Sequence, residues 1–128
     1  MDTNVFVNLE LVDTSLDSED LQAATRNLLK QVKAVDGVEE ADLVSVTEIP
    51  EGSMAIGGYV VGLLIAEISV ANLQKLGGFL KDRILAKNLK MTVKAYGKEM
   101  AIEASSQAEF DYAIQKANEQ IAQWAKEV

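Results

Sequence analysis

The feature that most constrains the fold of this 128-residue chain is an uncharged apolar tract of thirteen residues, Met54 to Ala66, with the sequence MAIGGYVVGLLIA. The tract is too short to cross a bilayer, which takes about 20 apolar residues, and Glu67 follows it directly. A stretch this apolar is also unfavourable on a water-exposed surface. We therefore expect it to be buried inside the domain or against another chain. Membrane insertion is disfavoured because charge at that depth is expensive.

The small residues of the tract predict a helix. Gly58, Gly62 and Ala66 are spaced four apart, and on a helix they would form one ridge that another helix can approach closely. Tyr59 and Leu63 would lie beside that ridge. We predict these five residues as the partner-binding surface. The alternative interpretation is that the helix is only the central helix of the domain, since a helix that is apolar all round is buried.

The predicted helical segment spans 54–86. It consists of one helix over about 59–71 and an amphipathic helix over about 73–86, with a single bent helix as the alternative. Gly77 and Gly78 fall inside the second helix, where glycine is unfavourable. They indicate either a bend or an element that packs very close to the helix.

The remaining segments show alternating and helical periodicity. Strands are predicted at 4–12 and 38–47, a β-hairpin at 89–104 with Gly97 at its turn, and helices from Asp17 to Gly37 and from Ser106 onward. The order is β-α-β-(α-α)-β-β-α. We expect one α+β domain over residues 1–128, with a four-stranded sheet and helices packed mainly on one face.

The amino-acid composition argues against most kinds of catalytic and metal-binding site. The chain has no cysteine and no histidine, which removes the thiolate nucleophile and the commonest general base and metal ligand. No S-x-x-K, G-x-S-x-G or Walker A pattern is present, and the acidic clusters lack calcium-loop spacing. A net charge of −8 disfavours nucleic acid as a partner. We expect a non-enzyme with no catalytic residues, no metal and no cofactor. The first residues do not read as a signal peptide, so we expect the cytoplasm.

The chain resembles one family, the effector-associated constant component proteins of bacterial conflict systems. The resemblance covers most of the chain. It rests on the opening alternating strand, D-S-E-D-L at Asp17–Leu21, the break around Pro50 and Gly52, V-G-L-L-I at Val61–Ile65, A-N-L-Q-K-L-G-G-F-L-K-D at Ala71–Asp82 and V-K-A-Y-G-K-E-M-A-I-E-A-S-S at Val93–Ser106. It implies an accessory or adaptor role beside effectors such as caspase-like or trypsin-like peptidases, and it offers no active-site motif.

These observations predict a non-enzymatic accessory or adaptor component of a bacterial conflict system. It would act by self-association as a homo-oligomer, or by docking to an effector such as a peptidase, through residues 54–86. The alternative is a membrane-acting component that exposes its apolar helical segment on activation.

Overall fold

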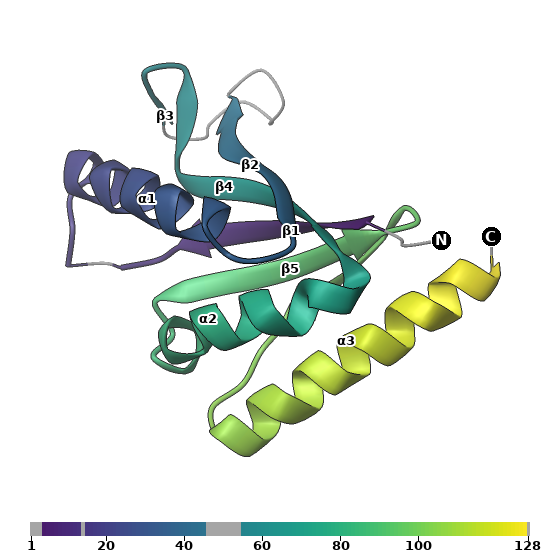
Figure 1. Ribbon diagram of the computed structural model, residues 1–128. Coiled ribbons are helices and arrows are strands. Elements are labelled where there is room, and N and C mark those ends of the chain that lie inside the picture. Colours follow the sequence, from purple (N-terminus) through teal and green to yellow (C-terminus); the bar gives the residue numbers. More distant parts are fainter. Residues whose placement is uncertain (1–3, 14, 46–54, 128) are drawn as a thin grey trace.

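The computed structural model describes residues 4–13, 15–45 and 55–127 and has an α+β fold, as the sequence predicts (Figure 1). In chain order the elements are β1 (Asn4–Leu11), α1 (Ser18–Lys33), β2 (Val38–Ser45), β3 (Ala55–Ile56), β4 (Tyr59–Ser69), a 3-10 turn (Val70–Asn72), α2 (Leu73–Leu85), β5 (Leu89–Ala95), β6 (Lys98–Ile102) and α3 (Gln107–Glu127). The described part thus contains three α-helices and one six-stranded sheet, where four strands were predicted.

The sheet is antiparallel, with the strand order β2-β4-β1-β5-β6, and β3 pairs only with β4. The elements β1-α1-β2-β4-α2-β5 follow the β-α-β-β-α-β order of ferredoxin-like domains. β6 and α3 extend that unit beyond β5. The predicted order of elements is therefore wrong between β2 and α2, where the strands β3 and β4 take the place of the first of the two predicted helices.

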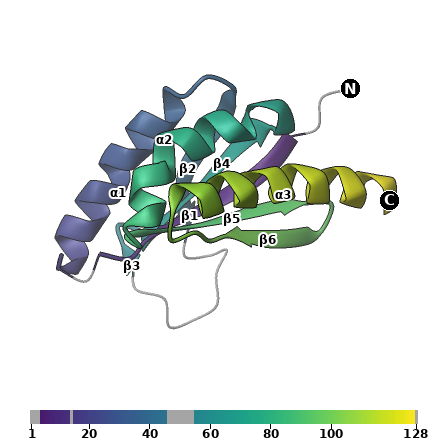
Figure 2. The same cartoon turned by 90° about the horizontal axis from the view of Figure 1, so that it is seen from below.

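All three helices cover the same face of the sheet, as the view in Figure 2 shows. The alternation of burial along the strands agrees. In β1 the side chains of Val5, Val7, Leu9 and Leu11 are buried, and in β5 those of Leu89, Met91, Val93 and Ala95 are buried. The side chains between them point to the other face. We call the face without helices the open face.

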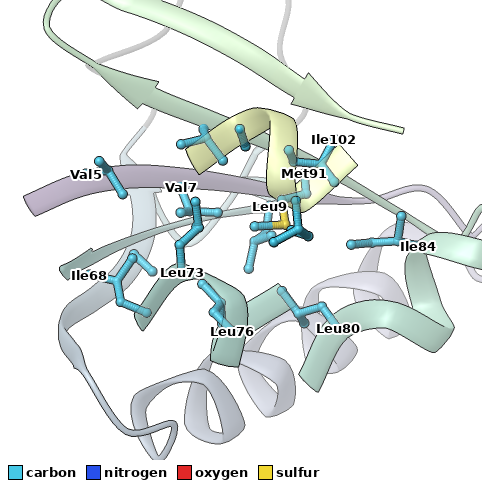
Figure 3. Packing of buried hydrophobic residues seen from close by; sticks show 14 of the residues in the cluster. Val5, Val7, Leu9, Ile68, Leu73, Leu76, Leu80, Ile84, Met91 and Ile102 are labelled. Atoms are coloured by element: carbon cyan, nitrogen blue, oxygen red, sulfur yellow. The ribbon is translucent and has the colours of Figure 1, made fainter. Parts of the chain in front are cut away.

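The core lies between the helices and the sheet. Figure 3 shows leucines of α2 facing the buried side chains of β1, with Met91 and Ile102 from β5 and β6 alongside. Leu73, Leu76 and Leu80 are fully buried at one residue per turn of α2. This confirms the predicted amphipathic helix over about 73–86, which the structure bounds at Leu73–Leu85.

The helix predicted over about 59–71 is wrong, because Tyr59–Ser69 forms β4. β4 is an inner strand, hydrogen-bonded to β1 on one side and to β2 on the other. Its content of Val and Ile favours a strand. A short apolar run without alternation does not distinguish an inner strand from a buried helix. The turn at Gly57 and Gly58, both with positive φ, connects β3 to β4 as a two-residue hairpin.

The predicted starts of the other two helices are confirmed. The predicted end of the first helix at Gly37 is wrong, because α1 already ends at Lys33 and Gly37, with a φ of +91°, lies in the turn before β2. The carboxylate of Asp17 accepts a hydrogen bond from the N–H of Asp20 at 2.8 Å and caps α1. At the start of α3, Ser106 Oγ accepts from the N–H of Glu109, whose own carboxylate accepts from the N–H of Ser105. Strand 38–47 is confirmed as β2 up to Ser45. The interruption of regular secondary structure predicted at Pro50 and Gly52 lies outside the described residues.

Candidate interaction surface

The candidate site is the open face, which none of the described helices covers. Strand register places its side chains in rows across the sheet. One row runs Glu40, Glu67, Phe6, Lys94, Glu99, and the next runs Asp42, Ile65, Asn8, Thr92, Ala101. A third row contains Leu63, Glu10 and Lys90.

Three large apolar side chains, Phe6, Leu63 and Ile65, lie among polar ones at the centre of the open face. Phe6 is 46% exposed, although it belongs to a strand at the middle of the sheet. Leu63 and Ile65 on the neighbouring strand β4 are only partly buried. An exposed apolar patch at a sheet centre is typical of a surface that binds another molecule.

Two hollows flank Phe6. One has a volume of about 240 Å³ and is lined by Phe6, Ile65, Glu67, Glu40 and Asp42, among others. The other, of about 400 Å³, lies on the opposite side of the ring beside Lys94, Lys98 and the turn at Gly97. Phe6 therefore lies between an acidic hollow and one of mixed charge, where Glu99 accompanies the two lysines.

Charge on the open face is divided. The β2–β4 side is acidic, with Glu40, Asp42 and Glu67, whereas β5 contributes Lys90 and Lys94. Lys94 pairs with Glu99 of β6 at 3.7 Å. Among the residues that the structure describes, no basic side chain forms a salt bridge with the three acidic residues of the β2–β4 side. Glu67 instead accepts a hydrogen bond from Asn4 at 2.9 Å.

The five residues predicted to bind a partner do not form one surface. Gly58 lies in the exposed β3–β4 turn, and Tyr59 beside it is 38% exposed. Gly62 and Ala66 are buried on the helix-covered side of the sheet. Only Leu63 lies on the open face at the sheet centre. The predicted helical ridge of small residues is therefore wrong, because Tyr59–Ser69 is a strand and Gly58 lies in the turn before it. A spacing of four residues places side chains on one face of a strand as well as of a helix, so it did not distinguish the two.

Phe6 and Ile65 were not predicted as site residues. Phe6 carried a signal, because it stands among Asn4, Asn8 and Glu10 on the polar side of an otherwise regular alternation. A large apolar side chain on the polar side of a strand is informative in this way. Ile65 gave no comparable signal, because all of its sequence neighbours are apolar.

Among the carboxyl groups that the structure describes, two have a clearly lowered pKa, and both lie away from the open face. The side-chain and backbone hydrogen bonds from Ser15 lower the pKa of Asp13, in the loop after β1. The hydrogen bond and charge of Lys98 lower the pKa of Glu127, at the end of α3. Both shifts have local structural causes. Within the described ranges, no group of three or more acidic side chains is arranged to hold a metal ion.

No helix in the described part of the chain is long and apolar enough to span a membrane. Comparison with protein-family models, curated proteins and solved structures finds no match to this chain.

Proposed function

We propose that this protein is a non-enzymatic accessory or adaptor component of a bacterial conflict system that acts by binding another protein through the open face of its sheet. The observation that carries the proposal is the exposed apolar centre made by Phe6, Leu63 and Ile65, on the face that no described helix covers. Complete burial of an exposed large apolar side chain is worth about 1.5–3 kcal/mol, and each of these partly exposed side chains would supply a part of it.

The nature of the partner rests on the family resemblance. Resemblance to the effector-associated constant components implies a role beside an effector such as a peptidase, and we combine it with self-association. The opening strand, the α2 sequence and the β5–β6 hairpin that carry the resemblance also build the helix-covered core. In the proposal, this scaffold presents the open face to the chain's own copies or to the effector. A chain without cysteine needs no oxidising compartment, so we place this role in the cytoplasm.

Two phenylalanines offer a matched test. Phe6 on the open face is 46% exposed, and Phe79 on α2 is 44% exposed. Phe6→Ser and Phe79→Ser therefore remove the same side chain at nearly equal exposure, from opposite sides of the molecule. Light scattering of each variant, alone and mixed with a caspase-like or trypsin-like peptidase of the kind that the resemblance implies, measures self-association and effector binding.

The proposal predicts that Phe6→Ser weakens association at least tenfold, while Phe79→Ser leaves it unchanged and both variants keep the wild-type circular dichroism spectrum. If the two variants associate as the wild type does in both experiments, the open face is not the binding surface.

A further inference from the structure

We propose that a cavity at the end of the β5–β6 ladder binds a free amino acid with an apolar side chain. The cavity has a volume of about 360 Å³ and lies between the end of α2, the start of β5 and the end of β6. Ligand cavities in proteins typically have volumes of about 300–1,000 Å³. This site goes beyond the proposed role of the open face, and its test uses no protein partner.

Strand β5 extends beyond the last residue of β6. The last register pair joins Met91 to Ile102, where β6 ends, whereas β5 already begins at Leu89. On its other side Leu89 lies opposite Leu11 of β1. The position opposite Leu89 on the β6 side is therefore not filled by a strand residue.

The backbone N–H and C=O of Leu89 point toward this position. The N–H of Val12 donates to the carbonyl oxygen of Asn88 at 3.0 Å, so Leu11 and Leu89 form a non-hydrogen-bonded pair of the antiparallel ladder. The backbone groups of such a residue face the strand on its other side. Among the residues that the structure describes, no turn or loop hydrogen bond uses Leu89, which is only 3% exposed. A ligand with one acceptor and one donor would satisfy both groups.

Charged side chains of both signs line the cavity, namely Lys87, Lys90 and Glu103. Lys87 Nζ donates a hydrogen bond to the carbonyl oxygen of Ala104 at 2.9 Å, which fixes the ammonium group without neutralising its charge. Within the described ranges, neither lysine forms a salt bridge. The cavity therefore offers cationic partners for a carboxylate and, at Glu103, an anionic partner for an ammonium group.

The backbone of Lys87 supports a role for its side chain. Lys87 follows the last turn of α2 with a φ of +65°, a conformation for which glycine is the favoured residue. Lysine at this position therefore has a conformational cost, and residues held in such conformations cluster at functional sites. The hydrogen bond to Ala104 orients the lysine side chain at the cavity.

The floor of the cavity is apolar. It contains Ile84, Met91 and Ile102, three core side chains that Figure 3 labels. One water molecule takes up about 30 Å³ in the liquid, so the cavity has room for about a dozen non-hydrogen atoms. Leucine and phenylalanine are amino acids of this size.

A free amino acid matches these groups because it is equivalent to one strand residue with charged ends. Its carboxylate accepts from the N–H of Leu89 and pairs with Lys87 or Lys90. Its ammonium group donates to the carbonyl oxygen of Leu89 and pairs with Glu103, and its side chain lies on the apolar floor. Such a ligand has no net charge, so the net charge of −8 on the chain does not repel it.

Isothermal titration calorimetry with L-leucine and L-phenylalanine tests the proposal. We expect at least one of them to bind with a dissociation constant in the millimolar range or tighter. Isocaproate, isoamylamine and glycine each lack one of the three groups of leucine, and each should bind at least tenfold more weakly. Absence of binding for both amino acids, or isocaproate binding as tightly as leucine, overturns the proposal.

Variants locate the site. Lys90→Met should weaken binding of the amino acid at least tenfold, whereas Lys75→Met, at an exposed position of α2, should leave it unchanged. Thermal unfolding checks that both variants fold. In the wild type, the amide resonance of Leu89 should shift on saturation with the amino acid. Equal binding by the two variants, or an amide resonance of Leu89 that does not move, places the ligand elsewhere and contradicts the proposal.

Discussion

The side-chain carbonyl oxygen of Gln22 accepts a hydrogen bond from the backbone N–H of Gly62 at 2.9 Å, across forty residues of sequence. Gln22 is 2% exposed and lies on the buried side of α1. Gly62 has a φ of +81°, and the register of β2 against β4 shifts beside it, between Leu43 and Ser45. The buried side chain of Gln22 on α1 therefore pairs with the backbone of β4 at the bulge, where the hydrogen-bond ladder between β2 and β4 is interrupted.

Removing this acceptor should destabilise the fold. Gln22→Met keeps the length of the side chain but leaves the N–H of Gly62 buried without a partner, which costs about 1–3 kcal/mol. Gln31→Met, at an exposed position of the same helix, is the control and should change the free energy of unfolding by less than about 0.5 kcal/mol. Urea denaturation measures both values. Equal stability of the two variants would show that the loss of this hydrogen bond is offset by removal of the Gln22 Nε2 group, which is buried without a partner.

Gly62 itself should tolerate no side chain. Alanine there takes a backbone conformation that L residues rarely adopt, and its Cβ would lie 3.1 Å from the carbonyl oxygen of Leu11 and 3.4 Å from Leu21. We expect Gly62→Ala to lower the free energy of unfolding by about 1–3 kcal/mol. The measurement is again urea denaturation, and a variant as stable as the wild type contradicts the positive φ.

The paired glycines of α2 should respond in opposite directions. A Cβ on Gly77 would lie 2.8 Å from Ile114 and 3.3 Å from Phe110, both on α3, whereas a Cβ on Gly78 meets no atom within 4 Å. Gly77→Leu should therefore push α3 away and destabilise the protein by about 1–3 kcal/mol. Gly78→Ala should stabilise it by roughly 0.5–1 kcal/mol, because alanine favours the helix.

Thermal unfolding of these two variants measures the difference directly. A higher melting temperature for Gly77→Leu would mean that α3 does not pack closely on Gly77, and a lower one for Gly78→Ala would mean that the position of Gly78 is not open. The sequence predicted either a close approach or a bend at this pair of glycines, and the structure shows the close approach, at Gly77 alone.

Regular periodicity made much of the fold predictable. The alternation of Val5, Val7, Leu9 and Leu11 identified β1, and the leucines of 73–86 identified α2. The hairpin at 89–104 was confirmed as β5 and β6 because its two halves alternate and a glycine separates them. In each case, local sequence and tertiary burial favour the same structure.

The apolar tract was not predictable in the same way. The spacing of Gly58, Gly62 and Ala66 fits a helix and a strand equally, and only the pairing of β4 between β1 and β2 decides between them. That pairing is long-range, as is the contact between Gln22 and Gly62. The candidate surface depended on this distinction, since the pairing of β4 with β1 places Ile65 on the same face of the sheet as Phe6.

The most direct test of the account is the accessibility of the open face in the assembled protein. The chain has no cysteine, so a single introduced one reports on its own position. Ala101→Cys lies on the open face and Ala23→Cys on α1, and both alanines are exposed in the single chain. Maleimide labelling should be at least severalfold slower at position 101 than at position 23 at high protein concentration or with the effector present, and should become equally fast on dilution. Equal labelling rates at both positions under every condition would contradict a protein partner on the open face.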